Sequence, residues 1–117
     1  MITSVHSIIY AGDADAARAF FRDVLRLPYV DAHDGWLIFK LPPSELAIHP
    51  EEGASGAHEL YLMCDDIDAT MAELAARGAE FTTPVRQAGF GRATAIRIPG
   101  GGQIGLYQPS HKTAYDA

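Results

Sequence analysis

The sequence predicts a single α+β domain built from two tandem copies of one βαβββ module. Three observations predict it: a repeat within the chain, one amphipathic helix in each copy, and short apolar segments separated by Pro and Gly after each helix. The chain has 117 residues, of which 48% are hydrophobic, so it is long enough for one core but too short for two full domains. Module one is expected to span residues 1–54, and module two residues 55–117.

The repeat is marked by a histidine before an apolar segment and by an aspartate after it. His6 leads into the segment that ends at Asp13, and 52 residues later His58 leads into the segment that ends at Asp65. Each apolar segment is expected to form the first strand of its module (residues 6–10 and 58–62).

A helix is expected after each first strand. In module one, apolar residues recur at helical spacing over residues 17–25, behind an Asp-rich start, and the pattern ends before Pro28. In module two the pattern covers residues 67–75. Asp68 is the expected N-cap there, and Gly78 lies where a left-handed residue ends many helices.

Short strands separated by turn residues are expected after each helix. Because one helix covers only one face of a four-stranded sheet, the second module is expected to cover the other face. The expected strands are residues 36–41 and 45–49 in module one, and residues 79–83, 92–98 and 103–108 in module two, with a seam between modules near residues 50–56.

The charge and cysteine content argue against several classes of protein. Nine Lys and Arg against fifteen Asp and Glu give a net charge of −6, so the chain has no basic footprint for nucleic acid. No apolar run approaches the length of a membrane span, and the N-terminus lacks a basic start, so we expect no membrane partner and a cytoplasmic location. The single cysteine, Cys64, fits a reducing compartment and is interpreted as a core residue.

In their order and spacing, these motifs resemble the vicinal oxygen chelate superfamily, which includes glyoxalase I, type I extradiol dioxygenases and bleomycin resistance proteins. The resemblance covers nearly the whole chain. It rests on HSII at 6–9, AFFRDVL at 19–25, GAHEL at 56–60, DDIDA at 65–69, RGA at 77–79 and PGG at 99–101.

The resemblance implies that the paired βαβββ modules form a half-open mixed β-barrel, with the helices outside and a ligand or divalent metal ion inside. It also implies a homodimer with two sites. The modules that face each other can come from one chain or from two, and the sequence does not choose between these pairings.

The resemblance implies metal ligands on the first strands. His6 and His58 fall on those positions, and a site with imidazole and carboxylate ligands would suit Ni, Zn, Mn or Fe. Gly105 stands where many members carry a glutamate ligand, which puts the usual site in doubt. His49, or Glu45 on the same side of its strand, is the candidate substitute, unless their apolar neighbours face inward instead.

Three functions remain open at this stage. The first is a small-molecule-binding, divalent-metal-dependent lyase, isomerase or dioxygenase. The second is a metal-free protein of the bleomycin resistance type that sequesters an antibiotic or a toxic metabolite, and the third is a member with only a structural or regulatory role. For the metal-free function, candidate ligand-binding residues are Trp36, Phe39, Tyr61, Phe90 and Tyr107. Phe90, between two glycines, belongs either to a lid or to a hairpin loop.

Overall fold

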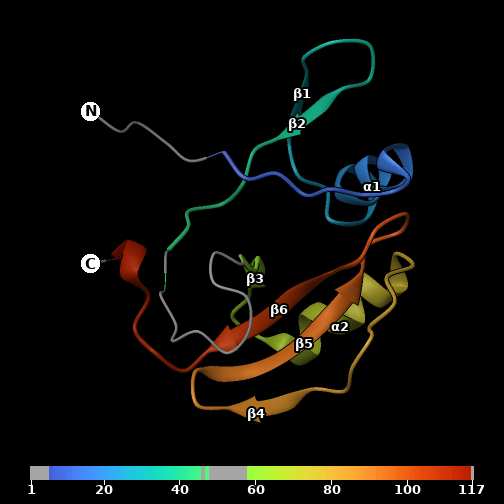
Figure 1. Cartoon of the computed structure of the whole chain (residues 1–117). Helices are drawn as coiled ribbons and strands as arrows, with labels where there is room; N and C mark the ends of the chain where they lie inside the picture. Colours follow the sequence, from blue (N-terminus) through green and yellow to red (C-terminus); the bar gives the residue numbers. More distant parts are fainter. Residues whose placement is uncertain (1–5, 46, 48–57, 117) are drawn as a thin grey trace.

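The computed structural model describes residues 6–45, 47 and 58–116, which form an α+β fold (Figure 1). We call residues 6–45 the first half and residues 58–116 the second half. No helix in these described residues is long and apolar enough to cross a membrane. The elements in chain order are α1 (Ala14–Ala19), the π-helical turn η1 (Phe20–Val24), β1 (Tyr29–Asp31), β2 (Leu37–Phe39), β3 (Tyr61–Met63), α2 (Ile67–Ala76), β4 (Arg86–Ala88), β5 (Gly91–Arg97), β6 (Gln103–Pro109) and the 3₁₀ helix η2 (Ala114–Asp116).

The second half forms a four-stranded sheet with the strand order β3-β6-β5-β4. β3 runs parallel to β6, whereas β6, β5 and β4 are joined as antiparallel neighbours. A strand, a helix and three further strands therefore follow one another along this half, as the sequence predicts.

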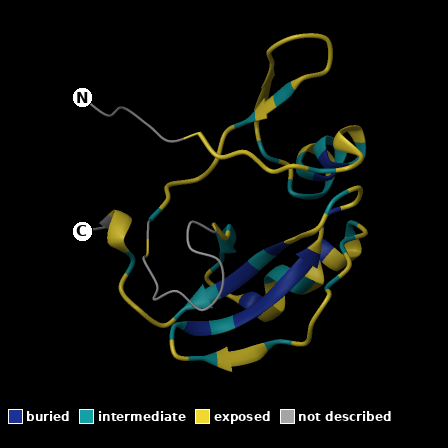
Figure 2. Cartoon of the chain, in the orientation of Figure 1, coloured by how far each residue is buried: buried dark blue, intermediate teal, exposed yellow. Residues whose placement is uncertain are grey.

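The core lies between the four-stranded sheet and the helices on one of its faces (Figure 2). Apolar residues of β5 and β6 alternate toward this face, where they meet the apolar stripe of α2. The first half adds Ala17 and Phe20 to the same core. The buried cluster consists of Ala17, Phe20, Ile67, Leu74, Ile96, Ile98, Ile104 and Leu106.

The N-terminal helix is attached to the turn between β5 and β6. The Asp13 side chain caps α1 by accepting a hydrogen bond from the Ala16 amide at 3.0 Å. The Asp13 amide in turn donates to the Gly100 carbonyl oxygen at 2.9 Å. Gly100 has a φ of +84°, and a Cβ at this position would overlap the Asp13 backbone, so glycine is needed here for two reasons.

β1 and β2 form a separate two-stranded antiparallel sheet in the first half (Figure 1). The Asp31 carboxylate holds the connecting loop by accepting hydrogen bonds from the amides of His33 and Gly35. This small sheet and the four-stranded sheet are not joined, and in the described single chain they do not close into the expected barrel.

Several expected strands differ from the structure. Residues 6–10 are described but form no strand, and residues 45–49, another expected strand, lie mostly outside the described residues. β1 was not expected. In the second half, β4 was not expected. The expected residues 79–83 form no assigned strand but do lie beside β5: Phe81 bridges to Ile96, the Arg97 amide donates to the Glu80 carbonyl oxygen, and the Thr82 amide donates to that of Ala95. The two-residue turn between β4 and β5 returns the chain directly onto β5, which makes β4 the paired neighbour.

α2 also begins earlier than the sequence predicts. The N-cap is Asp66, whose side chain accepts from the Ala69 amide at 3.1 Å, and not Asp68. The amide of Ile67, the first residue of the helix, donates to the Gln108 side chain on β6 at 3.0 Å, so this end of the helix is satisfied from another element. At the other end, Gly78 follows the C-cap with a φ of +96°, which confirms its predicted role.

Candidate functional site

The sheet presents a second face on the side away from α2. Ile104 and Leu106 point into the core, so the residues between and after them, Gly105 and Tyr107, lie on the other face. The parallel register places Tyr61 of β3 beside Gly105 on this second face. The second face is therefore built from β3, β6 and β5 and carries large aromatic side chains next to very small ones.

Three of the five predicted ligand-binding aromatic residues come together on the second face, and we call them the aromatic cluster: Tyr61, Phe90 and Tyr107. The ring centres of Tyr61 and Tyr107 lie 5.6 Å apart, and those of Phe90 and Tyr107 lie 5.3 Å apart. Tyr61 and Phe90 are 6.3 Å apart, and all three pairs meet edge to face. Phe90 belongs to the hairpin turn between β4 and β5.

Gly105 provides the space that the Tyr61 ring occupies. A Cβ built on Gly105 would overlap three carbons of that ring. A glutamate at this position therefore does not fit without displacing Tyr61. The glutamate-containing metal site of many related proteins does not fit here, and the residue pair instead favours aromatic contact with a ligand.

A polar cluster lies at the end of the aromatic cluster. The Tyr107 hydroxyl donates to Glu45 Oε1 at 3.1 Å and lies 3.3 Å from His111 Nε2. The second oxygen of Glu45 accepts from the Ala114 amide at 2.8 Å, and His111 Nδ1 lies 3.0 Å from the Lys112 carbonyl oxygen. Glu45, from the first half, is thereby joined to β6 and the C-terminal segment.

Both tyrosines of this site keep their protons over a wide pH range. Burial, followed by the neighbouring Glu45 carboxylate, raises the pKa of Tyr107 to about 12. Burial also raises the pKa of Tyr61; Glu59 acts in the same direction and Arg86 in the opposite one. At neutral pH the two phenols are therefore hydrogen-bond donors, and Glu59 and Arg86 lie close enough to Tyr61 to influence it.

The other two predicted aromatic residues lie in the first half and belong to a different group. Trp36 is 61% exposed, and the Arg18 guanidinium carbon lies 4.5 Å from its ring centre. Phe39 packs against Phe21 and Tyr29, with ring centres 5.7 and 5.8 Å away. No described ring contact connects either residue to the aromatic cluster.

The predicted metal ligands are placed as follows. His6 and His58 are both exposed, and His49 lies outside the described residues. Glu45 is part of the polar cluster described above. Within residues 6–45, 47 and 58–116, no three His, Cys, Asp or Glu side chains gather into a metal-binding group. The assignment of the three histidines to a metal remains a prediction.

The N-cap aspartates of the two helices have a different spacing from the two histidines. Asp13 caps α1 and Asp66 caps α2, 53 residues later, whereas His6 and His58 are 52 residues apart. An alignment on the N-caps places Glu59 opposite His6. Glu59 is not among the predicted site residues, because the sequence pattern aligns the two histidines.

Glu59 and His58 both precede β3 and are exposed. Glu59 lies close enough to Tyr61 to raise the pKa of its hydroxyl, whereas no described contact joins His58 to the aromatic cluster. Glu59 is therefore the better candidate for contact with a ligand on the second face.

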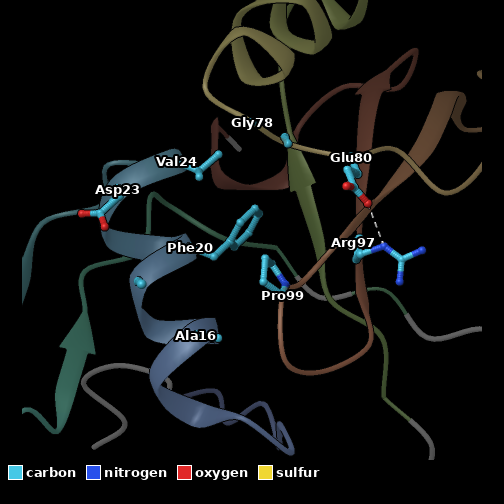
Figure 3. A pocket seen from close by; sticks show the side chains of 10 residues that line it. Ala16, Phe20, Asp23, Val24, Gly78, Glu80, Arg97 and Pro99 are labelled. Atoms are coloured by element: carbon cyan, nitrogen blue, oxygen red, sulfur yellow. Dashed lines mark hydrogen bonds and ion pairs between the residues drawn. The ribbon is translucent and has the colours of Figure 1, made fainter.

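A separate cavity of about 480 Å³ lies where the first half meets the second, on the helix side of the sheet (Figure 3). Phe20 and small residues of α1 form one wall, and Gly78 lies on the opposite wall. The ion pair between Arg97 and Glu80, at 3.1 Å, is exposed at the surface. The charged residues of its lining, Asp23, Glu80 and Arg97, are all exposed.

Comparisons with known proteins place the chain in context. A family model described as the Glyoxalase/Bleomycin resistance protein/Dioxygenase superfamily matches residues 3–106. Comparison with curated protein sequences gave no match.

Solved structures resemble the chain over nearly its full length. The antibiotic binding protein TnmS3 from Streptomyces sp. CB03234 is 25% identical, with a TM-score of 0.65 over 94% of this chain and 99% of that chain. A superfamily member from Sphaerobacter thermophilus is 26% identical, with a TM-score of 0.63 over 92% and 98%. Lactoylglutathione lyase from Agrobacterium tumefaciens, at 22% identity and a TM-score of 0.64 over 91% and 92%, shares the fold.

Proposed function

The chain belongs to the glyoxalase/bleomycin resistance protein/dioxygenase superfamily, and we propose that it is a binding protein that holds a flat organic molecule against the aromatic cluster. The observation that carries this proposal is the Tyr61 ring packed over Gly105, next to Phe90 and Tyr107. Sequestration of an antibiotic or a toxic metabolite is the function that this arrangement supports best.

The aromatic cluster has the properties of a surface that binds planar compounds. Tyr61 and Phe90 are only half-buried, so parts of their rings remain free for contact. Aromatic rings bury large areas and hold a second ring in a stacked or edge-to-face geometry. Gly105 is covered by the Tyr61 ring, and Ala93 and Tyr107 are buried, so a flat molecule would meet the exposed parts of Tyr61 and Phe90.

Charged groups near Tyr61 would orient the ligand. Glu59 and Arg86 both act on the Tyr61 hydroxyl, and both are exposed. A few polar groups around an apolar surface are the usual source of specificity in small-molecule sites. We therefore expect ligands that combine a planar ring system with a polar substituent at one edge.

The likeness to an antibiotic binding protein at 25% identity supports binding as the role of this chain. The alternative is a divalent-metal-dependent lyase, isomerase or dioxygenase that uses His6 and His58 or their substitutes. Glycine in place of the usual glutamate, with a ring packed on it, favours binding over this alternative.

We also propose that the protein is a homodimer in which the half-open barrel of paired modules is completed between two chains. The first half leaves apolar side chains of its two-stranded sheet exposed, including Val30 at 64% and Ile38 at 38%. Val30 and Ile38 are directly paired across β1 and β2, so they form one continuous apolar face. A second copy of the chain would cover this face.

Calorimetric titration with flat two- and three-ring compounds, with naphthalene-2-sulfonate and acridine orange as first probes, tests the binding function. We expect at least one of the two to bind with about one molecule per chain. Tyr61→Ala and Phe90→Ala should each weaken binding about tenfold or more, because each removes a ring from the contact surface. Tryptophan fluorescence is a poor reporter here because Trp36 lies in the other aromatic group.

Phe39→Ala is the matched control, since it removes a ring of the same size from the first half. It should leave affinity within about twofold, with circular dichroism used to check that the variants fold. Equal weakening by Phe39→Ala, or no binding of either probe by the parent protein, would overturn the proposal.

A further inference from the structure

Tyr107 is the least accessible ring of the aromatic cluster. It is 9% exposed, whereas Tyr61 and Phe90 are half-buried. Two residues outside the sheet lie against it: Glu45 Oε1 is 3.1 Å and His111 Nε2 is 3.3 Å from the Tyr107 hydroxyl. The ring centres of His111 and Tyr107 are 6.1 Å apart. Tyr107 is thus partly covered by side chains that do not belong to the sheet.

The segment after β6 is held at both of its ends beside the aromatic cluster. We call residues 110–114 the strap. At its start, the Ser110 amide donates to the Phe90 carbonyl oxygen at 2.9 Å. At its end, the Ala114 amide donates to Glu45 Oε2 at 2.8 Å. The strap therefore passes from the turn that carries Phe90 to the first half, and its histidine lies against the cluster between these two points.

The strap has few other contacts that hold it in place. No residue of the strap is among the buried hydrophobic residues. Most of its residues are exposed, namely Ser110, His111, Lys112 and Ala114. Segments with few buried apolar contacts and exposed hydrogen bonds open locally at a low free-energy cost. We therefore expect the strap to open more readily than the strands beside it.

The hydrogen bonding at the Tyr107 hydroxyl also limits how firmly the strap is held. His111 Nδ1 lies 3.0 Å from the Lys112 carbonyl oxygen, so in neutral His111 the proton is on Nδ1 and Nε2 is an acceptor. Glu45 is an acceptor as well, and Tyr107 has a single proton to donate. The hydroxyl therefore bonds only one of the two covering residues at a time.

We propose that the strap is a cover that separates Tyr107 from a ligand when closed and exposes it when open. The inference rests on the proposed binding function, because the strap controls access to the same aromatic cluster. With the strap closed, a flat molecule meets the free parts of Tyr61 and Phe90. With the strap open, it also contacts the Tyr107 ring, which adds aromatic surface. Because the ligand binds the open form better, the observed affinity depends on the fraction of molecules that are open.

Two variants that loosen the cover test its effect on binding. His111→Ala removes the ring that lies against Tyr107, and Glu45→Ala removes the carboxylate that holds the hydroxyl and the end of the strap. In calorimetric titrations, each variant should bind both naphthalene-2-sulfonate and acridine orange about threefold more tightly or better than the parent protein, because more molecules are open. The two probes carry opposite charges, so a change in protein charge alone would strengthen one and weaken the other.

Lys112→Ala is the matched control within the strap. Lys112 adjoins His111, but its exposed side chain makes no hydrogen bond or ion pair with the part of the chain that the structure describes. This variant should not strengthen the binding of both probes. Circular dichroism checks that all three variants remain folded. Unchanged or weaker binding by His111→Ala and Glu45→Ala, or opposite shifts for the two probes, would contradict a covering role.

Nitration by tetranitromethane measures the cover without a ligand. Tyr10, which is 90% exposed, is the internal reference. Peptide mass spectrometry should show that Tyr107 reacts about fivefold or more slowly than Tyr10 in the parent protein, and that both cover variants raise its rate about threefold or more. Unchanged nitration of Tyr107 in the variants rules out the cover, whether or not a probe binds. Absence of probe binding in the parent and the variants, together with faster nitration of Tyr107, supports the cover and contradicts the proposed binding function.

Discussion

The two halves of the chain bury their apolar side chains very differently. Only Ala17 and Phe20 of the first half are among the buried hydrophobic residues; the others lie between Ile67 and Tyr107 (Figure 2). The large exposed hydrophobic residues show the reverse. Apart from Tyr115, all of them lie in the first half: Ile8, Ile9, Tyr10, Tyr29, Val30, Trp36, Ile38 and Leu41.

The difference follows from how much surface each half can cover by itself. The second half has four paired strands and a ten-residue helix that covers one face. The first half has only a two-stranded sheet, and such a sheet is barely stable unless it packs against another surface. Its helix packs on the second half, whereas its small sheet leaves an apolar face exposed.

The largest expected effect concerns Phe20, which is 3% exposed and connects the halves. Phe20→Ala should lower the free energy of unfolding by about 3–5 kcal/mol, because it leaves a cavity in the shared core. Val30→Ala, at an exposed site, should cost about 0.5 kcal/mol or less. Urea denaturation measures both. Similar losses in the two variants would contradict the picture of a first half held by one buried contact.

The next effect concerns the turn that receives the N-terminal helix. Gly100→Ala should cost about 1–3 kcal/mol, because the new Cβ meets the Asp13 backbone in addition to the strain of a positive φ. Gly102→Ala is the control, since Gly102 also has a positive φ but open space around it. It should cost only about 1 kcal/mol. Thermal denaturation compares the two, and equal shifts would mean that the contact with Asp13 is unimportant.

A smaller effect is expected on association. Val30→Glu places a charge on the exposed face of β1 and should weaken the proposed dimer about tenfold or more, without unfolding the chain. Tyr115→Glu changes the exposed hydrophobic residue of the second half and should leave association unchanged. Analytical ultracentrifugation over a concentration series measures both. A monomeric parent protein would show that the open face has another role.

The smallest effect concerns ion pairs and pH. A hydrogen bond from Arg92 lowers the pKa of Asp68 in the folded protein. The pair therefore stabilises the fold fully above the ordinary aspartate pKa of 3.8. This stabilisation is lost as the pH falls through the lowered pKa of folded Asp68. Arg92→Gln should reduce this acid dependence. Arg22 likewise lowers the pKa of Asp23, but these neighbours in sequence can stay paired in the unfolded chain. Arg22→Gln should therefore change the pH dependence of stability less than Arg92→Gln does, as measured by denaturation between pH 2 and pH 6. A larger change in Arg22→Gln than in Arg92→Gln would contradict this explanation.

Local signals in the sequence predict much of the second half. The apolar spacing of residues 67–75 and Gly78 predict the body and the end of α2, because these features act within a few residues. The start of α2 differs from the prediction: Asp66 caps the helix through the Ala69 amide, and Gln108, far along the chain, accepts the hydrogen bond of the Ile67 amide.

The candidate site is predicted in part. Tyr61, Phe90 and Tyr107 are named by the sequence pattern and do meet, because each lies in or beside the second-half sheet. The pattern predicts strands β3, β5 and β6 of this sheet but not β4. Trp36 and Phe39 lie elsewhere because the first half does not fold over the same face in the described chain. His111 carries no local signal, since its role depends on where the segment after β6 turns.

The sequence alone determines the order of the motifs, the family and the helix-forming segments, since these depend on neighbours within one or two turns of chain. Tertiary structure decides which apolar faces are covered and which polar atoms converge. Glu45 and Tyr107 are 62 positions apart, and their contact exists only because the chain returns across the sheet. Alternation and spacing describe one element at a time, whereas burial and convergence depend on how the elements pack together.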